Sequence, residues 1–549
     1  MGGLHSGPRA TGDGKNTHAW WQRGVVYQVY PRSFADSDGD GVGDLLGITG
    51  RMAHLAWLGV DAVWISPIYP SPMVDFGYDV TDHTDVHPMF GTREDFDALV
   101  LEAHQLGLGV ILDYIPNHTS EEHPWFLQSR SARADPKRDW YIWRDPAPDG
   151  GPPNNWLSVF GGSAWTFDEA TGQYYYHAYL KEQPDLNWRN PQVREAMHDI
   201  MRFWLRRGAD GFRVDALRQL IKDDQFRDNP PNPDYLPGAS PYDKLLPVYS
   251  TDRPEIHEAI RGMRRVLEEY GDDRLLIGEL YLPIDRLVRY YGEGGSGVQL
   301  PMNLHLISTP WDAESVACLI DTYEASLPPE GWPTWVLGNH DRSRIASRVG
   351  PAQARVAAML LLTLRGTPTL YYGDELGMRD VPIPHELVQD PFERNVPGIG
   401  VGRDPERTPM QWSQEENAGF TTGTPWLPVS KDHVEVNVEA QGQDPRSMLS
   451  LNRRLLALRR AEPALAVGSY APVEAARGLL AYSREKDGSR FLIALNLGSE
   501  PRTLRAAGLA RGGQLILSTF LDREDEAVGE RLDLRGNEGL IVGIARRPD

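Results

Sequence analysis

The chain has 549 residues, 40% of them hydrophobic and 24% charged, which is the composition of a globular protein with two or three domains. Its net charge of −21 disfavours nucleic acid as a partner, because phosphate binding needs a basic surface. No run of 18 apolar residues occurs, so we expect no membrane span. The single cysteine, Cys318, excludes an intramolecular disulfide and a cysteine-based zinc site, and is expected to be a small buried hydrophobe.

Residues 1–17 are rich in glycine and polar residues and lack the apolar core of a signal peptide, so we expect a flexible tail and a cytoplasmic protein. Short β-branched runs then alternate with helical patterns. The expected strands cover residues 25–30, 62–67, 110–115, 211–215, 275–280, 299–304, 334–338 and 369–372. Eight such strand–helix units predict an α/β fold with a closed parallel barrel rather than an open sheet. No nucleotide-binding glycine motif accompanies the strands.

Residues 118–187 break this alternation, because the segment is too long for a barrel loop and is rich in Trp, Tyr, Pro and Gly. We expect a small inserted domain there, with most of its aromatic side chains in its own core. From residue 466, short alternating runs with Gly and Pro turns predict a small antiparallel β domain. The predicted organisation is a tail (1–17), a (β/α)8 TIM barrel (18–117 and 188–465), an inserted domain after the third strand (118–187) and a C-terminal β domain (466–549).

Three carboxylates stand at or just after the ends of expected strands: Asp215, Glu279 and Asp341. A charged residue is costly to bury, so after an apolar strand it is expected at the open end of the strand, facing a cleft. A satisfied salt bridge could explain any one of them. Three together, with an arginine and a histidine beside them, predict an acid/base site in an enzyme that cleaves carbohydrates.

Glycoside cleavage needs one ionised carboxylate and one protonated carboxylic acid on either side of the scissile bond. Arg213 lies two residues before Asp215, and alternate strand residues point the same way, so the guanidinium favours the charged form that suits a nucleophile. Glu279 has no cation adjacent in sequence, and desolvation by its apolar neighbours would suit it as the general acid/base. Asp341 is then left to bind sugar hydroxyls and to stabilise the oxocarbenium-like transition state.

Residues 36–44 read DSDGDGVGD, with carboxylates at alternate positions and glycines that let the loop wrap an ion. Oxygen ligands in this pattern suit a hard cation, Ca²⁺ or Mg²⁺. A full EF-hand would have Glu at the twelfth position, where Gly47 stands, so no EF-hand helix pair is expected. An acidic turn without an ion is the alternative. The expected ligands are Asp36, Asp38, Asp40, the backbone of Val42, and Asp44.

With these motifs the chain resembles the α-amylase superfamily, in its oligo-1,6-glucosidase and α-glucosidase branch, from about Trp20 to the C-terminus. The resemblance is carried by Glu279 and by residues 113–118 (DYIPNH), 183–187 (QPDLN), 211–215 (GFRVD), 339–341 (NHD) and 408–412 (TPMQW). The QPDLN stretch is the marker that separates this branch from true α-amylases. It argues against a second metal at Asn117, while the resemblance supports a structural calcium remote from the catalytic carboxylates; no organic cofactor is expected.

The resemblance also implies a set of residues that bind the sugar. They are Asp79, His118, Arg213, His340 and Arg403. Asp79 would bind hydroxyls of the non-reducing glucose and pair with Arg403 at the closed end of the pocket, with Arg407 as an alternative partner. For three of these residues a structural role is the alternative to sugar binding. Asp79 could cap a turn, and His118 and His340 could each be a hydrogen-bonded core residue.

The implied activity is exo-acting hydrolysis, with transfer, of terminal α-glucosyl residues from short oligosaccharides, with retention through a glucosyl-enzyme intermediate. At the position directly after the nucleophile, the resemblance associates Val with α-1,6 preference and smaller or polar residues with α-1,4, so Ala216 leads us to expect α-1,4 linkages. Trehalose synthase, sucrose isomerase and sucrose hydrolase remain alternatives, although the Arg-Leu-Asp-Arg-Asp stretch of the isomerases is missing. A non-catalytic transporter-associated homologue is a distant one, because such relatives lose carboxylates and carry a membrane anchor. A monomer or small homo-oligomer is expected.

Overall fold

The computed structural model describes residues 18–398, 400–505 and 512–544. The expected N-terminal tail lies outside the described residues. Among those described, no helix is both long and apolar enough to cross a membrane.

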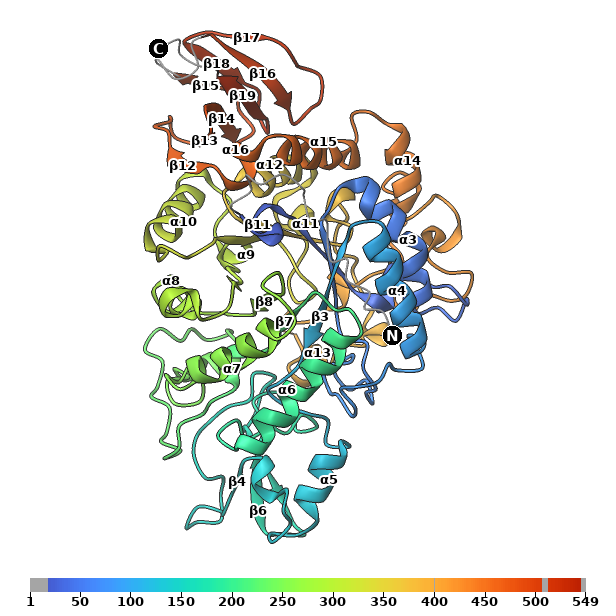
Figure 1. The fold of residues 1–549 in the computed structure, drawn as a ribbon, viewed down its shortest axis with the longest axis vertical. Coiled ribbons are helices and arrows are strands. Elements are labelled where there is room, and N and C mark those ends of the chain that lie inside the picture. The colour runs from blue at the N-terminus through green and yellow to red at the C-terminus, as the bar shows by residue number, and fades with distance from the viewer. Residues whose placement is uncertain (1–17, 399, 506–511, 545–549) are drawn as a thin grey trace.

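Eight parallel strands form the centre of the molecule, in the order β10-β11-β1-β2-β3-β7-β8-β9 (Figure 1). They are β1 (Val26–Val29), β2 (Ala62–Ile65), β3 (Gly109–Tyr114), β7 (Gly211–Val214), β8 (Leu275–Gly278), β9 (Leu300–Pro301), β10 (Thr334–Val336) and β11 (Thr367–Tyr371). Every residue in them is buried, which is why they read as continuous apolar runs rather than alternating ones. The predicted (β/α)8 TIM barrel is confirmed.

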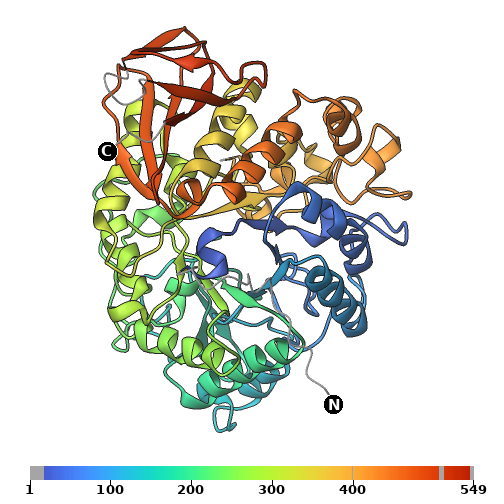
Figure 2. The ribbon, with the colours of Figure 1, turned by 45° about the horizontal axis from the view of Figure 1, so that its top comes forward.

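Helices cover the outside of the strands, and Figure 2 shows them arranged around the barrel. The long helices are α3 (Leu45–Leu58), α4 (Arg93–Gln105), α6 (Pro191–Arg206), α7 (Ile256–Glu268), α10 (Ala313–Ser326), α12 (Pro351–Thr363) and α15 (Met448–Ala461). Shorter ones are α1 (Trp20–Arg23), α2 (Pro31–Phe34), α8 (Ile284–Leu287), α9 (His305–Ser308), α11 (Ile345–Val349), α13 (Pro391–Asn395), α14 (Val438–Gln443) and α16 (Pro463–Val467).

Several of these helices begin at side-chain caps that the sequence encodes. Thr92 and Asp95 form a reciprocal capping box at α4, and Asn190 caps α6 ahead of Pro191 at its first position. Asp44 caps α3 by accepting a 2.7 Å hydrogen bond from the backbone of Gly47. This last cap bears on the expected metal loop, as shown below.

The segment between β3 and α6 lies beyond the barrel, at the opposite end of the molecule from the C-terminal strands (Figure 1). It contains α5 (Pro124–Ser131) and an antiparallel sheet in the order β4-β6-β5, made of β4 (Trp143–Arg144), β5 (Trp165–Asp168) and β6 (Gln173–Tyr176). Most of its aromatic side chains are buried, as expected. The buried ones are Phe126, Trp140, Tyr141, Trp143, Trp156, Phe160, Trp165, Tyr175 and Tyr176, while Trp125, Tyr174 and Tyr179 are partly exposed and Phe167 is exposed.

The C-terminal region is a pair of antiparallel sheets with a shared apolar core. The larger has the order β12-β13-β14-β19-β16-β17, from β12 (Ser469–Pro472), β13 (Leu479–Lys486), β14 (Ser489–Asn496), β16 (Gly513–Ser518), β17 (Ala527–Val528) and β19 (Gly539–Ile544). The smaller pairs β15 (Arg502–Arg505) with β18 (Arg531–Leu534). Buried Arg484 fastens this region to the barrel, because it donates to the backbone carbonyls of Thr363 and Leu465.

Cys318 is exposed, so the prediction that it is buried was wrong. The buried side chains of α10 include Ala313, Val316, Ile320 and Tyr323, spaced by three and four residues. Cys318 lies two residues after Val316, which at 100° per residue turns it towards the other side of the helix.

Candidate active site

The three predicted carboxylates meet in one cavity of about 390 Å³ at the carboxyl ends of the barrel strands. Asp215 directly follows β7, Glu279 directly follows β8, and Asp341 lies in the turn after β10. Active sites of parallel barrels form at this face, because the loops there converge from all strands. Other residues that line the cavity include Asp75, Tyr78, His118, Phe160, Tyr179, Ala216, Arg218, Tyr281, His340, Arg342, Phe392 and Arg403.

Arg213, on β7, organises three of the acidic groups. Its Nη1 is 2.7 Å from Asp113 Oδ1 and 2.8 Å from Asp215 Oδ1, and its Nη2 is 2.8 Å from Glu279 Oε1. Arg213 is buried and is not among the residues that line the cavity. It was expected to bind substrate, but the structure places it behind the carboxylates, where it orients them.

This arrangement corrects the sequence-based argument about Glu279. No cation adjoins it in sequence, yet in the fold it contacts the same guanidinium as Asp215. Its other oxygen, Oε2, accepts a 2.9 Å hydrogen bond from the backbone N–H of Ala216. Ala216 has φ 49° and ψ 33°, a left-handed conformation that is costly for a residue with a side chain and is typical of functional sites.

One guanidinium therefore faces three carboxyl groups, and they cannot all be ionised at low cost. Burial raises the pKa of Asp215 well above its usual value, Glu279 and Asp113 add to this effect, and Arg213 opposes it. Burial likewise raises the pKa of Asp113 to about 6, against the pairing with Arg213. Arg213 favours the charged form of Asp215, as expected, but burial and the neighbouring carboxyl groups outweigh it, so the net shift of the Asp215 pKa is opposite to the sequence-based expectation.

Asp341 has the opposite electrostatics. Its Oδ1 lies 2.9 Å from Arg407 Nη2 and 3.4 Å from Arg403 Nη1. Burial would raise the pKa of Asp341, but His340 and the two guanidinium groups outweigh it and hold that pKa well below its usual range. Asp341 is therefore a fixed negative charge beside the cluster.

The structure corrects the assignment of Asp79. This residue is fully buried away from the cavity, and its carboxylate accepts hydrogen bonds from Ser71 Oγ at 2.8 Å, Val74 N at 2.8 Å and Asp75 N at 3.0 Å. It therefore caps a turn, which was the alternative interpretation. Asp75 lines the cavity instead, and its Oδ1 lies 2.7 Å from Arg403 Nη2.

Arg403 was expected to pair with Asp79 and pairs with Asp75 and Asp390 instead, the latter at 2.6 Å. The physical reason is the backbone between the two motif aspartates, since Phe76 and Gly77 have φ values of 50° and 102°. Two successive positive φ values reverse the chain, so Asp75 and Asp79 point to opposite sides. The shared DFGYD motif was the available signal, but nothing in its spacing says which aspartate faces the cavity.

Both predicted histidines line the cavity. His340 stacks on Tyr78 with ring centroids 5.4 Å apart, and its Nε2 lies 2.8 Å from the Tyr78 hydroxyl. That hydroxyl donates in turn to Asp113 Oδ2 at 2.9 Å. The Nε2 of His118 lies 2.9 Å from the backbone carbonyl of Tyr78. Burial lowers the pKa of His340 to about 3, so its ring is a neutral hydrogen-bonding group.

The ammonium group of a lysine side chain lies beside Asn117. Lys222 Nζ lies 2.9 Å from Asn117 Oδ1 and also pairs with the carboxylate of Asp185, within the QPDLN marker. The ammonium group is buried and supplies the positive charge that joins the loop after β3 to the inserted segment and to the loop after β7.

Of the expected metal loop, Asp36, Asp38 and Asp40 converge, each with a carboxylate oxygen within 4.8 Å of the others. Asp44 departs from the expectation, because its two oxygens accept from Ser37 N and Gly47 N, both at 2.7 Å, in the cap of α3. Three carboxylates on a glycine-rich loop fit a hard cation. Val42 lies in the same loop, with its N–H donating to Asp40 Oδ1 at 2.8 Å.

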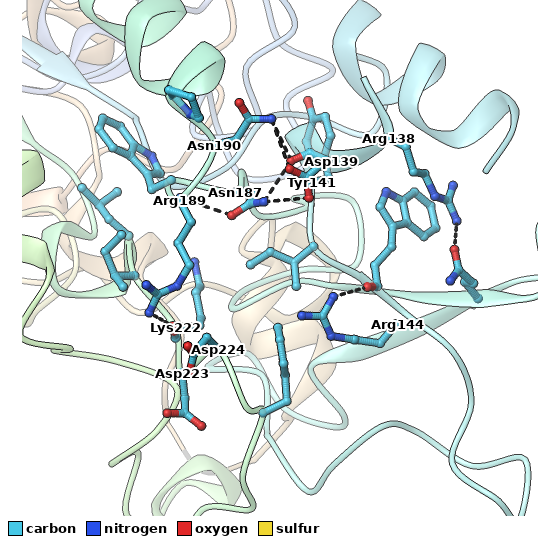
Figure 3. A pocket seen from close by; sticks show the side chains of 18 of the residues that line it. Arg138, Asp139, Tyr141, Arg144, Asn187, Arg189, Asn190, Lys222, Asp223 and Asp224 are labelled. Atoms are coloured by element: carbon cyan, nitrogen blue, oxygen red, sulfur yellow. Dashed lines mark hydrogen bonds between the residues drawn. The ribbon is translucent and has the colours of Figure 1, made fainter. Parts of the chain in front are cut away.

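A larger cavity, of about 690 Å³, lies between the inserted segment and the loop after β7 (Figure 3). None of the three catalytic candidates lines it. Its polar side chains largely satisfy one another, as when Asn187 and Asn190 both donate to Asp139 (Figure 3). We therefore interpret this cavity as a polar contact region between the inserted segment and the loop after β7, and not as the active site.

A parallel barrel with a guanidinium-linked carboxyl pair and a third, ionised carboxylate at its carboxyl-terminal face defines a glycoside hydrolase. The family model of the alpha-amylase catalytic domain matches residues 28–468. A probable alpha-glucosidase of Rhizobium meliloti is 44% identical over 502 residues, covering 88% of this chain and 90% of that protein. An oligo-1,6-glucosidase of Heyndrickxia coagulans is 38% identical over 520 residues, covering 87% of this chain and 92% of that protein.

Among solved structures, an alpha-glucosyl transfer enzyme superposes with a TM-score of 0.90 at 40% identity, covering 96% of this chain and 99% of that one. The chain belongs to the alpha-amylase catalytic-domain family.

Proposed function

We propose that this protein is a retaining, exo-acting α-glucosidase that hydrolyses, and also transfers, terminal α-glucosyl residues of short oligosaccharides. The observation that carries the proposal is the cavity itself, which holds Asp215 and Glu279 on one guanidinium and ends at the pair formed by Arg403 and Asp75. The likeness to an alpha-glucosidase and an oligo-1,6-glucosidase supports the same activity.

In the first step Asp215 attacks C1 of the bound glucosyl residue. Its Oδ1 is held by Arg213, while its Oδ2 has no hydrogen-bond partner among the described residues and is the attacking atom we infer. As the C1–O bond to the leaving group breaks, Glu279 gives its proton to the departing oxygen. The result is a glucosyl ester on Asp215, a deprotonated Glu279 and a free alcohol.

In the second step a water loses a proton to Glu279 and attacks C1, which breaks the ester and releases glucose with its original α configuration. Because adjacent nitrogens of Arg213 hold the two carboxyl groups, their spacing is compatible with the ~5–5.5 Å of retaining enzymes. Asp341, kept ionised by its two arginines, faces the positive charge that develops on the sugar ring in both transition states.

The closed end of the cavity supports exo action. Arg403 is held by Asp75 and Asp390, and its guanidinium carbon lies 5.1 Å from the centre of the Phe160 ring. A saccharide that continued beyond the bound glucose would meet these buried groups. Only a terminal residue fits, with Asp75 and Arg403 in reach of its outer hydroxyls.

Hydrolysis and transfer share the same ester, and the acceptor decides between them. The structural likeness to an alpha-glucosyl transfer enzyme supports transfer as a second outcome. The small Ala216 side chain lines the cavity next to Asp215 and supports a preference for α-1,4 over α-1,6 linkages.

We also propose a structural Ca²⁺ or Mg²⁺ held by Asp36, Asp38 and Asp40, which would tie the acidic loop in its turn. Asp36 already accepts from Gly39 N at 2.8 Å and Gly41 N at 2.8 Å, so the loop is wound before any ion binds. The carboxyl cluster of the barrel lies elsewhere, and no catalytic step is assigned to the ion. A cytoplasmic location and a monomer or small homo-oligomer remain part of the proposal.

The test is to incubate the pure protein with maltose, isomaltose, sucrose and trehalose and to resolve the products by chromatography and proton NMR. We expect glucose released first as the α anomer, with maltose the best of the four. Initial release of β-glucose from sucrose, whose other product is fructose, or a product formed only by isomerising one disaccharide, would contradict the proposal. Maltose and isomaltose do not decide the anomer, because their reducing-end glucose is released as a mixture of anomers.

A further inference from the structure

Two arginines at the outer part of the active-site cavity take no part in the chemistry described so far. Arg218, half-buried in the loop after β7, donates through Nη1 to the backbone carbonyl of Tyr281 at 2.7 Å. Arg342, exposed in the loop after β10, has its guanidinium carbon 5.5 Å from the centre of the Tyr281 ring. Both line the cavity.

These two guanidinium groups differ from those deeper in the site. Arg403 and Arg407 both pair with Asp341, whereas among the described residues neither Arg218 nor Arg342 forms an ion pair with a carboxylate. Asp243 also lines the outer cavity, is exposed, and pairs with neither. The carboxylates that line the cavity outnumber its three arginines, and Arg218 and Arg342 are the two of those arginines without a carboxylate ion-pair partner among the described residues.

The position of the two arginines relates them to the leaving group. Tyr281, which both contact, comes two residues after Glu279, the group that protonates the departing oxygen. The glucose is held at the other end by Arg403 and Asp75. A leaving group that departs past Glu279 therefore passes both guanidinium groups.

We propose that this cavity prefers α-glucosides whose aglycone carries an anionic group, a carboxylate or a phosphate, held by Arg218 and Arg342. The inference rests on the proposed α-glucosidase activity and names its substrate class. Guanidinium groups suit this task because their planar donors match the two oxygens of such anions. The C1–O bond still breaks, one water supplies OH to glucose and H to the released hydroxyl, and the aglycone keeps its charge.

The experiment compares kcat/KM for substrates that differ only in charge. Maltobionate and maltitol share their α-1,4 linkage and differ by a carboxylate against a CH₂OH group. Trehalose 6-phosphate and trehalose form the matched pair for phosphate, and the two arms tell the two anions apart. We expect a preference of about tenfold for the anionic member of at least one pair, the size of one charge-assisted hydrogen bond.

Arg218→Gln and Arg342→Gln should each reduce this ratio towards one, and added salt should reduce it in the parent protein because the site is open to solvent. Arg477→Gln is the control, since it removes the same charge from a side chain that is 96% exposed in the C-terminal region and should keep the ratio. Ratios near one in both pairs, or ratios unchanged in both variants, would overturn the inference.

Hydrolysis of p-nitrophenyl α-glucoside by the parent protein separates this inference from the proposed function. If the parent cleaves this substrate without any preference for anionic aglycones, only the inference fails. If it cleaves no α-glucoside at all, the proposed function fails.

Discussion

Asp75 and Asp79 stand four residues apart in one motif, and replacing each by Asn separates a sugar-binding role from a structural one. Asp75 pairs with Arg403 at 2.7 Å inside the cavity, and Arg403 keeps Asp390 and Asp341 when Asp75 is neutralised. The fold should therefore tolerate Asp75→Asn. A hydrogen bond to a charged group contributes about 1.5–3 kcal/mol, so kcat/KM for maltose should fall about 10- to 150-fold.

Asp79→Asn should lower the stability of the fold and change the activity of the folded protein little. Its carboxylate accepts three hydrogen bonds, and an amide NH₂ in its place must face at least one donor, which costs about 1–3 kcal/mol of folding free energy. The melting temperature should fall, while kcat/KM of the folded protein changes less than tenfold. Steady-state kinetics and thermal melts on both variants decide the matter. A larger loss of kcat/KM in Asp79→Asn than in Asp75→Asn, at unchanged melting temperature, would refute this reasoning.

Four further predictions follow from the same contacts. Glu279→Gln removes the proton donor, so kcat/KM for maltose should fall far more than for a nitrophenyl glucoside with a good leaving group; equal losses would argue against the acid role. Ala216→Val adds two methyl groups beside the leaving sugar and should shift the kcat/KM ratio from maltose towards isomaltose by about 10-fold or more; an isomaltose preference in the parent would contradict this. Chelation should lower the melting temperature if Asp36, Asp38 and Asp40 hold an ion, and Asp38→Asn should abolish the response; no response in the parent, or no ion by anomalous scattering, would rule the site out. Burial raises the pKa of Glu375 to about 7, against the hydrogen bond from Tyr27. The pKa of Glu375 in the unfolded chain is 4.5, so between pH 4.5 and 7 only the folded state keeps the proton, and the free energy of unfolding falls as pH rises, by about 3 kcal/mol in total. Glu375→Gln should remove this pH dependence. Parallel profiles of unfolding free energy against pH for the parent and the variant would contradict the assignment.

The barrel strands could be predicted because their signal is local. Buried parallel strands such as β3 and β11 are continuous apolar runs, and the carboxylates that follow β7 and β8 mark their open ends. The inserted segment and the C-terminal sheets were recognisable for the same reason, through composition and alternation.

The contacts that define the site were less accessible, because they join residues far apart in sequence. The pairing of Glu279 with Arg213 depends on β7 lying beside β8, so counting neighbours along the chain missed it. The choice between Asp75 and Asp79 depends on two backbone φ values. The exposure of Cys318, in contrast, could have been predicted from the sequence, because the spacing of apolar residues along α10 places it on the solvent-facing side of the helix.

The most direct test of the account is to trap the covalent intermediate. A fluorinated glucosyl donor that forms the ester quickly and releases it slowly should label the protein once, and peptide mass spectrometry should locate the glucosyl group on Asp215. A label on Glu279 or Asp341, or rapid turnover of unlabelled protein with inversion at C1, would contradict the assignment of Asp215 as the nucleophile.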